Sequence, residues 1–195
     1  MEGGFGGEPW SEAHGGYTFC AVAALQLMNQ LEAVDIPALR GWLVRRQMSY
    51  EGGFQGRSNK LVDGCYSFWQ GGALAILSSL YNKSKIPTTT DPWLHMHDDD
   101  NNDTTNNTSP FLLFQEEFLQ RYILLCAQDI NGGLRDKPSK TRDFYHSCYN
   151  LSGLSVSQHC GKLRYGHSTE SSVAATHPVY NIRRDRVDAM LRESL

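Results

Sequence analysis

Residues 51–70 read EGGFQGRSNKLVDGCYSFWQ, a glycine-led loop that passes through a polar turn into an apolar helical pattern. The same order of features begins at Gly3-Gly4-Phe5 and again at Gly132-Gly133-Leu134. The apolar helical patterns that follow the three loops cover residues 20–31, 69–81 and 149–159. Repeats on this scale are typical of an array of stacked structural units.

Polar residues recur in phase with these glycines. His14, Asp63 and Asp143 stand about eleven residues after the first glycine of their loops, and Tyr17, Tyr66 and His146 about fourteen residues after it. Equivalent turns of stacked units gather at one end of an array. We therefore expect Asp63, Cys65 and His146 to be neighbours in space, although about 80 residues separate them in sequence.

Two further segments have helical patterns and complete the repeated unit. Residues 36–48 carry an apolar helical face with Pro37 in the first turn, and residues 111–128 are longer and more apolar. Each ends in a glutamine-containing turn shortly before the next Gly-Gly pair. Alternating β-branched runs are nearly absent. The sequence therefore predicts an all-α domain of helical hairpins, with a last partial helix within residues 177–195.

The second interval between glycine loops is longer than the first. Gly3 and Gly52 are 49 residues apart, whereas Gly52 and Gly132 are 80 apart. Residues 83–109 account for the excess and contain the polar run HDDDNNDTTNNTS. Its low complexity predicts a disordered surface insertion between hairpins. Its histidines and aspartates could also be taken for a metal site, but a flexible loop does not preorganise ligands.

Composition limits the class of protein and of partner. The chain has 195 residues, of which 40% are hydrophobic, with a net charge of −3 and a pI near 6.1. These values are typical of a globular domain and give no reason to expect nucleic acid. No apolar run is long enough for a membrane span. Five cysteines without a secreted-scaffold spacing favour reduced thiols. We therefore expect a cytoplasmic protein.

Asp63, Cys65 and His146 form a candidate zinc site. Carboxylate, thiolate and imidazole are all zinc ligands, and three protein ligands with an open fourth position are typical of a catalytic site. Taken alone, Asp63-Gly64-Cys65 is more typical of an exposed turn, and His146 of an ordinary polar residue, than of a metal site. The repeat phase favours the metal site, because it places both segments at equivalent turns.

Beside this triad, the loops and helix starts supply groups suited to a diphosphate. Helix N-termini present unpaired N–H groups, and cationic and hydroxyl side chains add charge and donors. The residues concerned are His14, Arg57, Asn59, Lys60 and Tyr66. For Arg57 and Lys60, a solvated loop is the alternative. The following helices begin with Tyr17, Phe19, Cys20, Phe68 and Trp69, which predicts an aromatic cavity next to a cationic rim. A lipid-like diphosphate would suit that combination.

At this point the chain resembles a known family. EAHGGYTFC (12–20), EGGFQGRSNKLVDGCYSFWQ (51–70) and GGLRDKPSKTRDFYHSCYNLSGLS (132–155) closely resemble the β subunits of protein farnesyltransferases. The resemblance covers the C-terminal half of such a subunit. It implies an α/α toroid of helical hairpins, here incomplete, that works as a heterodimer with an α subunit. It also implies transfer of a farnesyl group from farnesyl diphosphate to the cysteine of a C-terminal CaaX motif.

The resemblance also implies residue roles. Zinc is expected on Asp63, Cys65 and His146, with Tyr66 also at the catalytic centre, and magnesium near Asp136. The diphosphate is expected on His14, Arg57, Lys60 and Tyr66, with Gly15, Ser58 and Asn59 in the same loops. The isoprenoid wall is expected to include Gly16, Tyr17, Cys20 and Trp69, and the peptide to pack near Tyr145. Asp136 and the run Asp143-Phe144-Tyr145-His146 favour the farnesyl enzyme, since geranylgeranyl type I relatives have lysine at the position of Asp136.

Three other interpretations remain open. The chain could be a truncated, non-catalytic module that binds an α subunit, and this predicts zinc well below one per chain. It could be a geranylgeranyltransferase β subunit. A terpene cyclase on the same fold would need an acidic protonating motif and no zinc triad, so Asp63, Cys65 and His146 argue against that class.

Overall fold

The computed structural model describes residues 2–82, 112–161, 163–166 and 171–193, and the predicted insertion at 83–109 lies outside them. The longer helices are α1 (Gly15–Leu27), α2 (Ile36–Val44), α3 (Tyr66–Asn82), α5 (Phe144–His159) and α6 (Arg184–Glu193). A short 3₁₀ turn, η1 (Leu31–Ala33), precedes α2, and α4 (Glu116–Arg121) continues into the π-helical turn η3 (Tyr122–Ala127).

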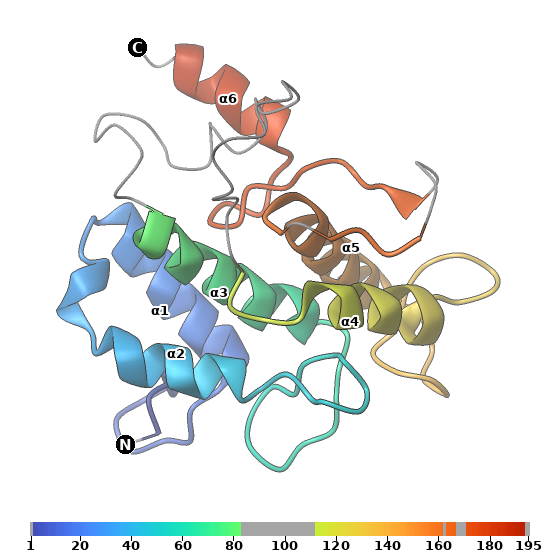
Figure 1. The fold of residues 1–195 in the computed structure, drawn as a ribbon, viewed down its shortest axis with the longest axis horizontal. Helices are drawn as coiled ribbons and strands as arrows, with labels where there is room; N and C mark the ends of the chain where they lie inside the picture. The colour runs from blue at the N-terminus through green and yellow to red at the C-terminus, as the bar shows by residue number, and fades with distance from the viewer. Residues whose placement is uncertain (1, 83–111, 162, 167–170, 194–195) are drawn as a thin grey trace, which may run out of the picture.

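Helices α1, α3 and α5 lie side by side in chain order, and each directly follows one of the three glycine loops (Figure 1). Helix α2 packs against α3, and α4 packs against α5, so these two form a second layer. Within the described residues, β-pairing is limited to isolated bridges. The prediction of an all-α array of helical hairpins is therefore confirmed.

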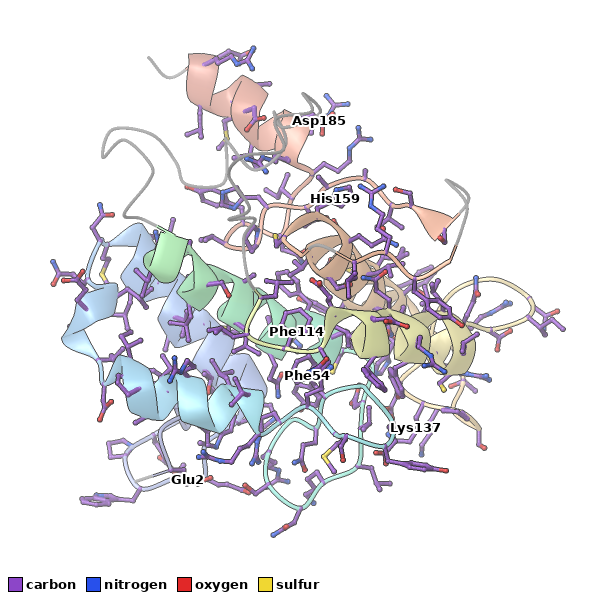
Figure 2. The ribbon with its side chains drawn as sticks, viewed as in Figure 1. Glu2, Phe54, Phe114, Lys137, His159 and Asp185 are labelled. Atoms are coloured by element: carbon purple, nitrogen blue, oxygen red, sulfur yellow. The ribbon has the colours of Figure 1, made fainter. Side chains whose placement is uncertain are left out.

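The glycine loops repeat one another in their hydrogen bonds. Thr18 Oγ1 accepts from the N–H of Phe5, and Ser147 Oγ accepts from the N–H of Leu134, in each case 13 residues earlier. Bridges pair Gln47 with Phe54 and Gln128 with Leu134, at the glutamine-containing turns that the sequence indicated. The apolar residue of the second loop, Phe54, is fully buried and meets Phe114 with ring centroids 5.6 Å apart (Figure 2). The repeat in the amino-acid sequence therefore corresponds to a repeat in local structure.

The three inner helices begin three to five residues earlier than predicted. Their in-phase polar residues explain the difference, because His14 and Asp143 cap α1 and α5, and Asp63 orders the turn directly before α3. The His14 ring accepts from the N–H of Gly16, Asp63 Oδ1 from that of Cys65, and Asp143 Oδ1 from that of His146. Caps of this kind satisfy N–H groups that have no partner within the helix.

The segment 111–128 departs from its prediction in the opposite direction, because the helix starts only at Glu116. The side-chain amide of Gln47 explains the late start. It donates to the carbonyl of Gln115 and accepts from the N–H of the same residue, at 2.9 and 2.8 Å. This pairing holds the backbone at Gln115 outside the helix.

The C-terminal part confirms the predicted last helix, now α6, in which Val187 is buried. A bridge between Thr176 and Arg183 precedes it, as bridges precede α3 and α5. Across the described ranges, the helices are too short or too polar to cross a bilayer.

Candidate metal centre and adjoining pocket

Asp63, Cys65 and His146 come together as the repeat phase predicted. Asp63 and Cys65 lie at the turn that starts α3, and His146 lies in the first turn of α5. One ligand atom from each residue lies within 4.8 Å of the other two, and His146 Nε2 is 3.3 Å from Asp63 Oδ1. Cys65 is 4% exposed, and the other two side chains are partly exposed. The cluster is therefore formed by adjacent repeats and is partly exposed to solvent.

Asp143 orients the imidazole of His146. Its Oδ2 lies 2.6 Å from His146 Nδ1, and its Oδ1 accepts from the backbone N–H of the same residue at 2.7 Å. These hydrogen bonds lower the pKa of Asp143, so the carboxylate stays charged. A carboxylate on one ring nitrogen fixes the tautomer that presents the other nitrogen to a metal. Here that nitrogen is Nε2, which faces Asp63.

Burial raises the pKa of the Cys65 thiol far above its usual range, and the nearby Asp63 carboxylate adds to the shift. Without a cation the thiol is therefore protonated at neutral pH. Because a metal ligand must be the thiolate, metal binding at this cluster would release a proton.

His14 and Tyr66 form a second polar group beside the cluster. His14 Nδ1 accepts from the Gly16 N–H, and Nε2 lies 2.8 Å from the Tyr66 hydroxyl oxygen. Burial, helped by the charge of Arg57, lowers the pKa of His14, so the ring is neutral at neutral pH. Because Nδ1 accepts a hydrogen bond, the single ring proton is on Nε2. Nε2–H therefore donates to Tyr66, and the phenolic proton of Tyr66 is left to donate to a ligand.

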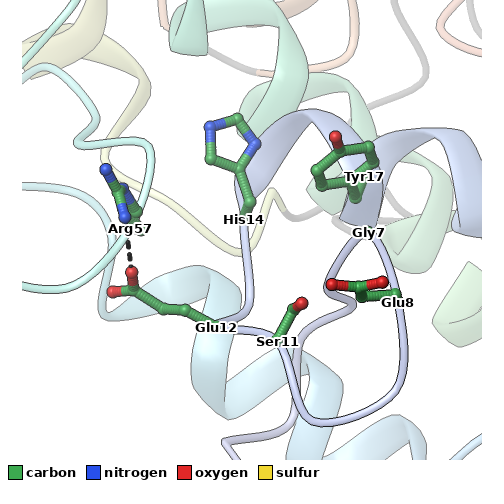
Figure 3. Close-up of a pocket in the computed structure, with 7 residues that line it drawn as sticks. All are labelled: Gly7, Glu8, Ser11, Glu12, His14, Tyr17 and Arg57. Atoms are coloured by element: carbon green, nitrogen blue, oxygen red, sulfur yellow. Dashed lines mark hydrogen bonds and ion pairs between the residues drawn. The ribbon is translucent and has the colours of Figure 1, made fainter.

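A pocket of about 530 Å³ opens beside His14 and Tyr17, between the first two glycine loops (Figure 3). Arg57 reaches its rim from the second loop and pairs with Glu12 at 2.7 Å. Both side chains are 42% exposed, so the ion pair is in contact with solvent. Arg57 can therefore exchange Glu12 for another anion at little cost.

The other residues of the second loop that were predicted to lie near the diphosphate are Ser58, Asn59 and Lys60, and they differ in exposure and in hydrogen bonding. Ser58 Oγ accepts from Arg46 at 2.7 Å and thereby anchors the loop to the end of α2. Asn59 is exposed with a φ of 59°, the left-handed conformation that asparagine tolerates in turns. The side chain of Lys60 is exposed, and the backbone N–H of Lys60 donates to the side-chain oxygen of Gln55.

An aromatic surface extends from the cluster along α3 and α5. The rings of Trp69 and Tyr149 pack with centroids 4.3 Å apart, and Trp69 Nε1 donates to the Tyr145 hydroxyl at 3.1 Å. Phe19, on α1, contacts Trp69 edge-on. Tyr17, which is 55% exposed, and the exposed Cys20 lie on α1.

Asp136 lies within electrostatic range of the cluster, since its charge contributes to raising the pKa of both Cys65 and Tyr66. Its Oδ2 pairs with the ammonium of Lys137, while its buried Oδ1 has no hydrogen-bond partner in the described chain. The Asp136 carbonyl accepts from the Gly64 N–H and from the Tyr122 hydroxyl. The loop is thus held by its backbone, and the carboxylate has free acceptor capacity.

The sequence pattern did not predict the contacts of three residues of this region. Tyr149 had a usable signal, because it stands four residues after Tyr145 and so shares its helix face. Asp143 is an in-phase polar residue, but the repeat phase does not predict its contact with the His146 ring. Nothing in the sequence pattern indicated that Glu12 would pair with Arg57.

Comparison with known proteins agrees with this architecture. Residues 1–182 match the family described as the prenyltransferase alpha-alpha toroid domain. The chain is 42% identical to the protein farnesyltransferase β subunit of Pisum sativum, over 95% of this chain and 54% of that protein. It is 46% identical to the corresponding subunit of Arabidopsis thaliana, over 81% of this chain and 40% of that protein.

Among solved structures, the chain is similar to Candida albicans protein geranylgeranyltransferase-I complexed with GGPP. The TM-score is 0.72 at 26% identity, over 99% of this chain and 47% of that one. The chain spans about half the length of the curated relatives it matches. The predicted fold, an incomplete α/α toroid, is confirmed, and the chain belongs to the prenyltransferase α/α toroid family as a relative of protein farnesyltransferase β subunits.

Proposed function

We propose that this chain is the zinc-binding part of a cytoplasmic protein farnesyltransferase β subunit. In a heterodimer with an α subunit, it would transfer a farnesyl group from farnesyl diphosphate to the cysteine thiol of a C-terminal CaaX motif. The observation that supports this best is the convergence of Asp63, Cys65 and His146 beside a cationic loop and an aromatic surface.

The cluster fits zinc in chemistry and in size. Zinc bonds of about 2.0–2.3 Å place tetrahedral ligand atoms roughly 3.3–3.8 Å apart. The three ligand atoms already lie within 4.8 Å of one another, so small side-chain adjustments suffice. Three protein ligands leave a fourth position for the substrate thiol. Zinc bound here would lower the pKa of that thiol, so that a thiolate is present near neutral pH.

The diphosphate is proposed to bind at the rim formed by His14, Arg57, Lys60 and Tyr66. Tyr66 can donate its phenolic proton because it accepts its own hydrogen bond from His14. Arg57 would exchange Glu12 for a diphosphate oxygen. These donors would stabilise the negative charge that develops on the leaving diphosphate.

The isoprenoid is proposed to lie along the aromatic surface. Trp69 and Tyr149 offer stacked faces there, and Gly16, Tyr17 and Cys20 would line the side formed by α1. Tyr145, hydrogen-bonded to Trp69, would contact the peptide between this surface and the metal.

Asp136 is proposed as a magnesium ligand. Mg²⁺ in such sites takes one or two carboxylates together with substrate phosphates. The unpartnered Oδ1 of Asp136 suits this role.

The proposal is tested by co-expressing this chain with a farnesyltransferase α subunit and measuring zinc content and transfer to a CaaX peptide. We expect one zinc per chain and faster transfer from farnesyl than from geranylgeranyl diphosphate. Preference for the longer donor would favour a geranylgeranyltransferase β subunit. Zinc well below one per chain, with no diphosphate binding, would favour a non-catalytic module.

Replacing Arg57 by alanine is expected to weaken farnesyl diphosphate binding by about 10–150-fold, since a hydrogen bond to a charged group is worth roughly 1.5–3 kcal/mol. A displacement assay with a fluorescent farnesyl diphosphate analogue measures this. Arg192→Ala is the control, because α6 lies at the opposite side of the molecule from the second loop (Figure 1). Equal affinity of the two variants would remove Arg57 from the diphosphate site.

A further inference from the structure

The side-chain amide of Asn150 joins the two repeats that form the metal cluster. Asn150 lies on α5, one turn after His146, and is fully buried. Its Nδ2 donates to the carbonyl of His146 at 2.9 Å and to that of Arg135, in the third glycine loop, at 3.1 Å. Both acceptors are carbonyl oxygens, so an NH₂ group is required at this position.

The same amide packs against the turn that carries the other two ligands. Gly64 separates Asp63 from Cys65, and a methyl group at Gly64 would lie 2.4 Å from Asn150 Nδ2. On its other side, the Gly64 N–H donates to the Asp136 carbonyl at 2.7 Å. Asn150 therefore fixes the distance between α5, which carries His146, and the turn that carries Asp63 and Cys65.

An equivalent amide occurs one repeat earlier without metal ligands around it. Gln70 donates to the Gln55 carbonyl at 2.7 Å, and a methyl group at Gly15 would lie 2.4 Å from its Nε2. The Gly15 N–H likewise donates to the next loop, at the Gly56 carbonyl. Gln70 is also fully buried. The repeat thus contains a matched internal control for Asn150.

We infer that Asn150 is a positioning residue for the metal centre, which sets the separation of His146 from Asp63 and Cys65 through its contacts with the His146 carbonyl and Gly64. This inference rests on the proposed metal site. It follows from geometry. His146 lies on α5, whereas Asp63 and Cys65 lie on the turn before α3, so their separation is fixed only if the contact between α5 and this turn is fixed. Residues that orient metal ligands typically change metal affinity by about 10–100-fold.

The test compares Asn150→Leu with Gln70→Met in the complete chain co-purified with an α subunit. Each substitution removes one buried amide without adding charge. We expect similar decreases in thermal stability, because both leave loop carbonyls unpaired. Only Asn150→Leu is expected to weaken Co²⁺ binding, by about tenfold or more, read from the thiolate-to-cobalt charge-transfer band.

A rescue variant separates positioning from general damage. Asn150→Gln installs the side chain that the preceding repeat uses against Gly15, and we expect Co²⁺ affinity within a few-fold of the unsubstituted chain. Equal Co²⁺ affinity of Asn150→Leu and Gln70→Met would overturn the inference while leaving the metal site intact. Absence of Co²⁺ binding by the unsubstituted chain would overturn the metal site, and the inference with it.

Discussion

Replacing Cys65 by alanine is expected to abolish stoichiometric zinc binding and prenyl transfer together. The substitution removes one of the three proposed metal ligands of the cluster. Loss of a direct ligand should decrease metal affinity by more than the roughly 10–100-fold that follows loss of a residue that hydrogen-bonds to a ligand and orients it. The measurements are zinc content after gel filtration of the complex and the rate of transfer to a CaaX peptide.

Cys160→Ala is the matched control, because Cys160 is also 4% exposed but belongs to the apolar core. Both variants lose a buried thiol of the same size, so packing costs should be similar. Only Cys65→Ala should lose zinc. If it keeps one zinc per chain and turns over normally, Cys65 is not a ligand and the proposed mechanism is wrong.

The phase of the glycine loops was enough to predict the array of helices and the approach of Asp63, Cys65 and His146. This succeeded because each loop is closed by an equivalent backbone hydrogen bond, in which the N–H of His14, Asp63 or Asp143 donates to the carbonyl nine residues earlier, so equal spacing in sequence becomes equivalent position in space. The hydroxyls of Thr18 and Ser147 add a second contact 13 residues back in the first and third loops.

Features that depend on one particular contact could not be predicted in this way. The late start of α4 depends on the Gln47 side chain, which comes from a segment 68 residues earlier. The pairing of Arg57 with Glu12 and the stacking of Tyr149 on Trp69 depend on side-chain conformations across repeats. A periodic pattern specifies which faces meet, but it does not specify how individual side chains pair on them.

Phe68→Ala is expected to have the largest effect on stability. Phe68 is fully buried on α3, and its ring contacts Phe19 of α1 and Tyr149 of α5, with centroids 4.9 and 5.8 Å apart. Truncating a buried phenylalanine costs about 3–5 kcal/mol, because the cavity closes only partly. For a chain of this size, that lowers the melting temperature by about 6–20 °C. Thermal unfolding of the purified complex measures the shift.

The control is Phe144→Ala at the start of α5, where the ring is 96% exposed and the expected change is within about 0.5 kcal/mol. Since Phe68 packs against Tyr149, its loss should also weaken farnesyl diphosphate binding, because Tyr149 would lose support for its contact with Trp69. Zinc content should fall less, since none of the three proposed metal ligands contacts the Phe68 ring in the described interactions. Equal melting temperatures for Phe68→Ala and Phe144→Ala would mean that the inner helices do not pack through this ring.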